Sequence, residues 1–284
     1  MKVWRGMSKF IILPNRSIIV FQGMAAKQLL NQTTTNNILN LSQNKSLYSL
    51  LLNPSGRYMY DFFVVQYGKY VLLDCCSTQK EEIIQRFLLY KLQLKITIKE
   101  KKHYKVGVFI GEHHDKSECG YTYCENDAVF FQDPRLSKLG LRVIFDESNE
   151  MFSDLKYSVG EYEDYELLRI SNTVPDCSKD MIKGTSFPLQ FRMEQLNAID
   201  FNKGCYIGQE TVARMYRAGI KKNIYTVVSE HESFCDTKVM CDQQEIGKLL
   251  SHVGNIGLCL LNINSRNDLC NLEIGSVKVK VLLS

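Results

Sequence analysis

Short apolar runs separated by turn residues recur along the chain, and they limit it to a fold rich in strands. After Gly219, five such runs follow one another without a helical period, at 223–230, 237–242, 245–253, 256–263 and 276–284. Several short strands with turn residues between them are typical of small closed β structures. The sequence therefore predicts a small C-terminal β-barrel over residues 218–284.

The first part of the chain mixes strands with helices. Residues 46–76 contain three apolar runs separated by turn residues at 53–56 and at Gly68, which predicts an antiparallel meander of three strands. Apolar residues at helical spacing predict helices at 24–32, about 79–91 and 159–172. Further strand-like runs occupy 16–23, 92–100, 104–110, 128–132 and 140–145. The predicted fold class is α+β.

The composition indicates a globular protein outside membranes. The chain has 35 basic and 31 acidic residues, and this net charge of +4 is too small to require a nucleic-acid backbone as partner, whereas a small anionic ligand fits it. No stretch approaches the roughly 20 apolar residues of a membrane-spanning helix. The first ten residues lack the apolar core of a signal peptide. We therefore expect a cytoplasmic protein of bacterial type, with no membrane or nucleic-acid partner.

The ten cysteines show no metal-binding pattern. They include no CxxC pair and no zinc-type pairing with histidine, so we expect no metal site within the chain. Because secretion signals are not recognised, the thiols are expected to be reduced. Most of them are expected to serve as small buried apolar residues.

One cysteine stands in different surroundings. Cys205 lies in the segment DFNKGCYIGQETVARMYRAG, residues 200–219, just before a helix that is predicted to begin near residue 207 or 208. The N–H groups at the start of that helix would favour a thiolate, as would Lys203 and, if the chain folds back, Arg214 or Arg217. The glycines on both sides would let a ligand approach the backbone. From these residues alone, a reactive thiol and a structural thiol remain equally open.

The same segment resembles the signature of a known family. KGCYIGQE, residues 203–210, followed by VAR and RAG, is similar to the motif of the YgfZ folate-binding proteins, which are related to the T-protein, the aminomethyltransferase of the glycine cleavage system. Other stretches resemble the family in the same order, namely FQGMAAKQLLNQTTTNN, LLNPSGRYMYDFFV, DPRLSKLGLRVI and YELLRISNTVPD. Together these matches span residues 18–217, and the tail fits the family's barrel more loosely.

The resemblance implies a fold and a function. The fold would be T-protein-like, with antiparallel sheets and flanking helices in two interleaved subdomains that form a folate-binding region at 1–217, followed by the barrel. The chain would be a folate-binding accessory factor for assembly or repair of iron-sulfur clusters in client enzymes, including radical-SAM enzymes that modify tRNA. The implied cofactor is tetrahydrofolate or a folate derivative, and the implied partners are client enzymes and cluster-carrier proteins. A cluster normally needs several thiolates close together, so the chain would not hold one alone.

The resemblance also implies which residues form the site. The positions that carry over are Lys203, Cys205, Tyr206, Gln209, Glu210 and Arg214. The first two would act as the catalytic pair beside the folate, and all six would contribute to its binding. Tyr206 could instead be a core aromatic residue, and Glu210 could form an i,i+4 ion pair with Arg214 worth about 0.3 to 0.5 kcal/mol. Gly204 and Gly208 are interpreted as backbone requirements.

Two places depart from the transferases of this fold. Gln190 stands where relatives often carry a glutamate that binds the pterin ring, and an uncharged amide binds a pterin edge less strongly than a carboxylate does. Tyr60 and Asp61 stand where the transferases have two adjacent aspartates, so one acid is absent. Aminomethyl transfer needs a carboxylate at the folate to manage protons, and its loss argues against that reaction. Asp61 remains a candidate binding residue.

The function therefore remains a choice among three hypotheses. We prefer the folate-dependent accessory factor, in which Cys205 and Lys203 act beside the pterin. The alternatives are a tetrahydrofolate-dependent aminomethyltransferase and a non-catalytic docking module for cluster transfer, so enzyme activity is left open. Four arginines could pair with the carboxylates of a folate tail, and none is assigned because each alone is more often a solvated surface residue: Arg57, Arg135, Arg142 and Arg169.

Overall fold

Residues 9–111, 118–153, 158–230, 233–263 and 271–282 are described by a computed structural model of the chain. Contacts within the chain divide it into two units, and each unit is assembled from separated segments. The first comprises Met1–Leu52, Met59–Tyr162 and Gln195–Ile207, and the second comprises Asn53–Tyr58, Glu163–Glu194 and Gly208–Ser284. The predicted domain boundary between 217 and 218 stays a prediction.

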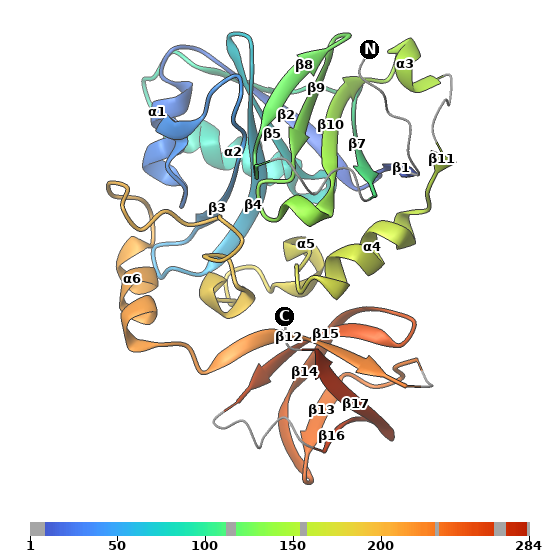
Figure 1. Ribbon diagram of the computed structural model, residues 1–284. Coiled ribbons are helices and arrows are strands. Elements are labelled where there is room, and N and C mark those ends of the chain that lie inside the picture. Colours follow the sequence, from blue (N-terminus) through green and yellow to red (C-terminus); the bar gives the residue numbers. More distant parts are fainter. Residues whose placement is uncertain (1–8, 112–117, 154–157, 231–232, 264–270, 283–284) are drawn as a thin grey trace. The chain divides into compact units, whose positions relative to one another are not determined.

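A five-stranded sheet forms one half of the first unit (Figure 1). Its strand order is β3-β4-β5-β2-β6, with bounds β2 Arg16–Gln22, β3 Leu47–Leu52, β4 Tyr58–Tyr67, β5 Tyr70–Cys76 and β6 Thr97–Glu100. β4 pairs antiparallel with β5, and β5 pairs antiparallel with β2. The predicted meander is therefore present as β3-β4-β5. The strand predicted at 92–100 is wrong for its first part, because the chain turns at Leu92, whose φ is 45°.

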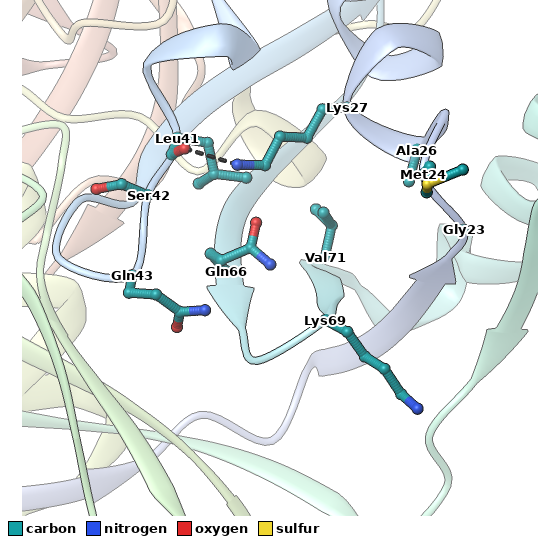
Figure 2. Close-up of a pocket in the computed structure, with 10 residues that line it drawn as sticks. All are labelled: Gly23, Met24, Ala26, Lys27, Leu41, Ser42, Gln43, Gln66, Lys69 and Val71. Carbon is teal, nitrogen blue, oxygen red and sulfur yellow. Dashed lines mark hydrogen bonds between the residues drawn. The ribbon is translucent and has the colours of Figure 1, made fainter.

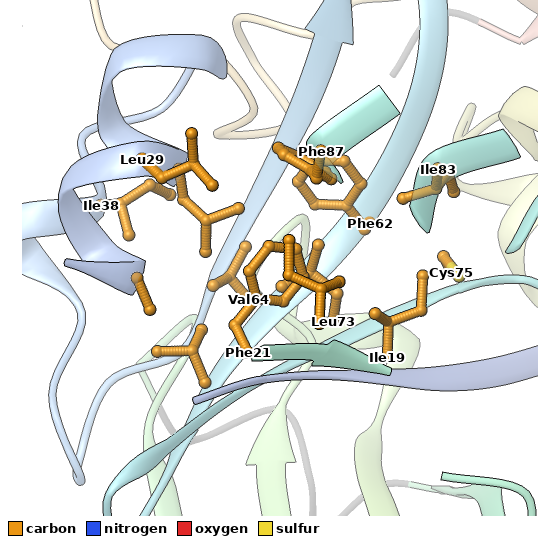
Figure 3. Close-up of a cluster of buried hydrophobic side chains, with 14 of the residues drawn as sticks. Ile19, Phe21, Leu29, Ile38, Phe62, Val64, Leu73, Cys75, Ile83 and Phe87 are labelled. Carbon is orange, nitrogen blue, oxygen red and sulfur yellow. The ribbon is translucent and has the colours of Figure 1, made fainter. Parts of the chain in front are cut away.

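Side-chain alternation along these strands builds the apolar core under the helices. Phe62 and Val64 on β4 point to the same face, and they pack with Phe21 against helices α1 (Ala26–Thr33) and α2 (Lys80–Tyr90) (Figure 3). The rings of Phe21 and Phe87 meet edge to face, with centroids 5.1 Å apart. The same alternation turns Asp61, the residue before Phe62, toward the other face of the sheet.

A six-stranded sheet forms the other half of the first unit. Its order is β11-β1-β7-β10-β9-β8, with bounds β1 Lys9–Ile12, β7 Tyr104–Ile110, β8 Thr122–Glu125, β9 Ala128–Gln132, β10 Leu141–Asp146 and β11 Ser158–Val159. Phe10, Phe109 and Phe145 pack in its apolar cluster with Phe152 of the short helix α3 (Glu150–Ser153). Two-layer packing of this kind confirms the predicted α+β class.

Buried charges link the two sheets. Asp74 on β5 accepts from Arg16 Nε at 2.6 Å and from Arg142 Nη2 at 2.7 Å, and the guanidinium of Arg142 lies 4.0 Å from the centroid of the Phe63 ring. Burial acts to raise the pKa of Asp74, but the two arginines outweigh it and hold this pKa below its ordinary value. The carboxylate is therefore ionised and fully paired inside the unit.

The second unit contains the closed barrel and the helices that precede it. The barrel order is β12-β15-β14-β13-β16-β17, with bounds β12 Lys222–Ser229, β13 Lys238–Cys241, β14 Gln244–Val253, β15 Ile256–Asn262, β16 Leu272–Ile274 and β17 Val277–Leu282. The predicted barrel is thus confirmed, with β16 as an additional short strand. None of the helices in the described part of the chain has the length and hydrophobicity of a membrane span.

A second charged network holds helices α4 (Tyr162–Ser171) and α5 (Cys177–Asp180) to this barrel. Arg169 donates to both carboxylate oxygens of Glu166 at 2.7 Å and to Asp180 at 3.2 Å. Asp180 in turn accepts from the backbone N–H of Ser251 on β14 at 2.9 Å. Although burial opposes it, the pairing lowers the pKa of Glu166 to about 2. The helix predicted at 159–172 is therefore confirmed as α4.

Candidate functional site

Cys205 is an exposed thiol in a loop. It lies in a stretch without helix or strand that leads along the chain into helix α6 (Gln209–Ala218). Its side chain is exposed, whereas those of Cys75, Cys177 and Cys259 are buried. The expectation that most cysteines are small buried residues is wrong for the nine described ones, because only Cys75, Cys76, Cys177 and Cys259 are buried. The sulfur of Cys205 is accessible to a partner or a ligand.

Lys203 fastens the same loop to the end of helix α1. Its ammonium donates to three backbone carbonyls, those of Asn31 and Thr34 at 2.6 Å and that of Asn36 at 2.8 Å. The last carbonyls of a helix lack partners inside it, so a cation is favoured there both as a donor and by the helix dipole. Burial lowers the pKa of Lys203 to about 8, and the charged form therefore still dominates at pH 7.

This geometry gives Lys203 a positioning role. An ammonium has three N–H donors, and all three are directed to carbonyls, so none remains for the thiol of Cys205. The cation also lies 5.2 Å from the ring centroid of Tyr206, within the range of a cation–π interaction. Any catalytic role for Lys203 itself stays a prediction.

Further hydrogen bonds hold the chain just before Lys203. The hydroxyl of Thr35 donates to the carbonyl of Ala198 at 2.6 Å, and the N–H of Asp200 donates to the carbonyl of Thr35 at 3.1 Å. Thr35 is completely buried. The loop that presents Cys205 is therefore fixed to the segment after α1 at several points. Backbone carbonyls of this kind carry no signal in a sequence, which is why their role was not predicted.

Tyr206 is buried, with 8% of its surface exposed. Burial, followed by the nearby charge of Asp200, raises the pKa of its hydroxyl, so the phenol is neutral at physiological pH. Its contact with Lys203 makes it part of the packing that supports the loop. The structural interpretation of Tyr206 is the one that these contacts favour, and its binding to folate stays a prediction.

The remaining signature residues belong to the second unit. Helix α6 begins at Gln209, one or two residues later than predicted, and Gly208 precedes it with a left-handed φ of 83°. Gln209 is half-buried, whereas Glu210 and Arg214 are exposed. Among the described residues no ion pair joins Glu210 to Arg214. The i,i+4 pair considered for these two residues is therefore absent from this part of the chain.

Gln190 also belongs to the second unit, in the short 3-10 helix η4 (Pro188–Phe191). Its side chain is half-buried, and within the described residues its carboxamide makes no hydrogen bond. One donor group and one acceptor group are thus available to a ligand.

Asp61 and Tyr60 lie in the first unit and face opposite sides of β4. The hydroxyl of Tyr60 donates to Glu82 Oε2 at 2.7 Å, on the side of helix α2. Asp61 is 5% exposed and accepts from the hydroxyl of Tyr48 at 3.0 Å. The carboxylate of Asp61 is therefore hydrogen-bonded inside the unit, and the neighbouring side chain of Tyr60 is buried.

Three of the four arginines considered for a folate tail are paired with internal carboxylates. Arg142 binds Asp74 and Arg169 binds Glu166, as described above, while Arg135 binds both carboxylate oxygens of Asp133, at 3.0 and 2.8 Å. Each of these three side chains is at most 7% exposed. The idea that they are solvated surface residues is wrong, because each side chain is buried beside its own acid. Arg57 is half-buried and lies 4.2 Å from the centroid of the Phe187 ring.

The structure therefore distributes the predicted site over both units. Lys203, Cys205, Tyr206 and Asp61 belong to the first, and Gln190, Gln209, Glu210 and Arg214 belong to the second. Within the first, Lys203 and Tyr206 contact each other at the start and end of the loop that carries Cys205. The sequence did not reveal that three backbone carbonyls bind the ammonium of Lys203.

Comparisons with known proteins agree with this architecture. The family model for the CAF17 C-terminal beta-barrel domain matches residues 225–283, a range that contains the barrel strands except for the first residues of β12. In overall fold the chain is similar to the crystal structure of the glycine cleavage system aminomethyltransferase T from Bartonella henselae, with a TM-score of 0.78 over 98% of this chain and 85% of that one. The sequence identity is 10%, so the match establishes the T-protein-like fold and no more.

Sequence relatives carry the same description in several organisms. The iron-sulfur cluster assembly factor IBA57 homolog of Pyricularia oryzae is 25% identical, over 92% of this chain and 73% of that protein. Human iron-sulfur cluster assembly factor IBA57 is 28% identical, over 75% of this chain and 64% of the human protein. The Dictyostelium discoideum homolog is 28% identical over 80% and 64%, respectively. The chain thus spans about two thirds of the length of the last two relatives.

These relatives correct the expected location. All three are named as mitochondrial proteins, which contradicts the expectation of a cytoplasmic protein. That expectation relied on the first ten residues, which lack the apolar core of a signal peptide, and this feature argues against secretion without separating the cytoplasm from mitochondria. In sequence, the chain is similar to iron-sulfur cluster assembly factors of the IBA57 type, and its fold is that of an aminomethyltransferase with a closed C-terminal barrel.

Proposed function

We propose that the chain is a folate-binding accessory factor of the YgfZ type, which helps to assemble or repair iron-sulfur clusters in client enzymes. The observation that carries the proposal is an exposed, free thiol at Cys205, held on a loop that Lys203 fixes in place. Relatives that are named as cluster assembly factors support it. The proposed clients include radical-SAM enzymes that modify tRNA.

Cys205 would supply one ligand to a cluster that is shared with a client or a carrier protein. Iron-sulfur clusters are normally held by four thiolates, and one exposed cysteine can provide only one of them. In the described part of the chain, no group of three or more His, Cys, Asp or Glu side chains is arranged to hold a metal ion. The cluster is thus proposed as cargo, with its remaining ligands on the partner.

The side chain of Gln190 has the hydrogen-bonding groups that folate binding needs. The half-exposed carboxamide of Gln190 offers both a donor and an acceptor to the edge of a pterin. A neutral amide can therefore take the place of the glutamate that relatives carry at this position. Bound folate would supply a pterin that can carry one-carbon units or electrons. We further propose that Gln209, Glu210, Arg214 and Asp61 contribute to the binding region, and that Arg135, Arg142 and Arg169 do not.

Aminomethyl transfer is not favoured. The position of the second acid is held by Tyr60, which is 2% exposed and hydrogen-bonded to Glu82. A neutral, enclosed phenol cannot replace a carboxylate that manages protons at the folate. A docking module without folate would be favoured if folate failed to bind.

Cluster assembly can be tested by complementation of cells that lack their own assembly factor. We expect the wild-type chain to restore the activity of [4Fe–4S] enzymes in cells that lack their own IBA57 or YgfZ protein, because the thiol and its loop are intact. Client activity per amount of client protein is the measurement, and an enzyme without a cluster is the control. Unchanged client activity, at normal levels of the supplied chain, would rule out the proposed role.

Folate binding can be tested by calorimetric titration with tetrahydrofolate. Replacing Gln190 by leucine should weaken binding about tenfold, because a polar edge of the ligand is left without its partner. Replacing Gln190 by glutamate should strengthen binding by a similar factor, since a charged acceptor makes the stronger hydrogen bond. Gln93, which is exposed in the first unit, provides the control when it is changed to leucine. Absence of folate binding by the wild-type chain would favour the docking module.

A further inference from the structure

A pocket of about 470 Å³ opens in the first unit between helix α1, the segment after it and the β4–β5 turn (Figure 2). It is lined by Gly23, Met24, Ala26, Lys27, Leu41, Ser42, Gln43, Gln66, Lys69 and Val71. None of these residues belongs to the cysteine signature, and the volume is that of a small-molecule site. The lining contains two lysines and no acidic residue, so its charge favours an anion.

Helix α1, which contributes Ala26 and Lys27 to the lining, begins without a side-chain cap. The residue before the helix, Ala25, offers no side-chain cap, and the first turn contains no acid. Among the described residues, the backbone N–H groups of Lys27 and Gln28 have no acceptor. Within the described part of the chain, the ammonium of Lys27 makes one hydrogen bond, to the carbonyl of Leu41 at 2.8 Å, and retains two further donors. A helix N-terminus with free N–H groups and a neighbouring lysine is suited to an oxyanion.

Gln66 supplies an independent indication that a ligand belongs here. Its Nε2 donates to the carbonyls of Gly68 at 2.6 Å and Tyr70 at 3.1 Å, which fixes the orientation of the carboxamide. Its Oε1 has no partner among the residues that the structure describes, although the side chain is only 8% exposed. Figure 2 shows this side chain in the middle of the lining residues, on the side of Lys27 and Leu41. A buried acceptor without a donor is costly, and a ligand N–H or O–H would satisfy it.

We infer that this pocket binds a small-molecule oxyanion that carries a hydrogen-bond donor, with the singly protonated form of a phosphate monoester, whose second pKa is about 6, as the ligand class. The anionic oxygens face the helix N-terminus and Lys27, and the protonated oxygen donates to Gln66 Oε1. Because the pocket is larger than a phosphate ion, the rest of the ligand lies along Ser42, Gln43 and Lys69. The inference is independent of the proposed cluster function.

A comparison of phosphate with sulfate separates anion binding at the helix N-terminus and Lys27 from hydrogen-bond donation to Gln66. Inorganic phosphate keeps a P–OH at pH 7, whereas sulfate has the same shape and no proton to donate. We expect phosphate to shift the amide resonances of Lys27 and Gln28 saturably in NMR titrations at constant ionic strength. Sulfate should bind about tenfold more weakly, because the acceptor then faces an unprotonated oxygen.

Variants assign the effects to residues. Gln66→Met should reduce phosphate binding to the level of sulfate, and Lys27→Met should weaken both anions. Thermal unfolding monitors whether each variant remains folded, and Lys27→Met remains informative if Gln66→Met does not fold. Equal binding of the two anions by the wild-type chain would overturn the assignment of Gln66. The absence of any shift at Lys27 and Gln28 would show that the pocket is not an oxyanion site.

Discussion

Replacing Lys203 by methionine should lower the free energy of unfolding by roughly 3 kcal/mol. Methionine retains much of the buried apolar stem but leaves the carbonyls of Asn31, Thr34 and Asn36 without their donor. Hydrogen bonds to charged groups contribute about 1.5 to 3 kcal/mol each, and their contributions at one nitrogen are not additive. Urea unfolding of the purified protein at pH 7 is the measurement, because Lys203 is mainly charged at that pH.

An exposed lysine of the same unit provides the matched control. Lys102 is exposed, and its change to methionine should alter stability by less than about 0.5 kcal/mol. Replacing Lys203 by arginine should restore only part of the loss, because a planar guanidinium cannot direct three N–H groups as an ammonium does. If the methionine variants at positions 203 and 102 were equally stable, the proposed anchor of the Cys205 loop would not exist.

Replacing Gly208 by alanine should cost a similar amount, about 3 kcal/mol. A Cβ at this position would lie 2.6 Å from the carbonyl oxygen of Asn53 and 2.9 Å from Gly56 Cα. Both neighbours are backbone atoms, which cannot turn aside as a flexible side chain does. The left-handed φ of 83° adds strain for any residue with a Cβ. The midpoint of thermal unfolding should therefore fall by several degrees.

The other signature glycine provides the comparison. A Cβ at Gly204 would meet none of the described atoms within 4 Å, and this residue is not among those with positive φ. Gly204→Ala should accordingly change stability by less than about 0.5 kcal/mol. The interpretation of both glycines as backbone requirements is thus supported for Gly208, and the described contacts give no such reason for Gly204. Equal losses in the two variants would contradict this distinction.

Most of the fold could be predicted because it follows from local patterns. The three helices and the meander have clear apolar periods, and the barrel strands are separated by turn residues. The strand at 92–100 was overextended because its apolar alternation continues through a turn that begins before β6. The arrangement of the six-stranded sheet, in which β1 near the start of the chain pairs with β7 and β11, depends on long-range pairing that local patterns do not specify.

The site was predicted less completely, for a physical reason. The signature identified Cys205 and its neighbours, and the structure places this thiol on the surface of a loop. The role of Lys203 escaped prediction because its partners are backbone carbonyls about 170 residues earlier in the chain. Arg142 was taken for a surface residue because its partner Asp74 lies 68 residues earlier in the chain, which no local pattern shows. For Arg169 the sequence did place Glu166 three residues earlier on the predicted helix, but this spacing does not show that the pair is buried.

Client activation by cysteine variants tests the central role of Cys205 most directly. Cys205→Ala and Cys124→Ala each remove an exposed free thiol from the first unit, and neither change should alter the thermal unfolding midpoint. In cells without their own assembly factor, Cys205→Ala should lower client [4Fe–4S] enzyme activity at least about tenfold, whereas Cys124→Ala should match the wild-type chain. If a folded Cys205→Ala protein activates clients as fully as the wild-type chain does, the thiol has no part in the function.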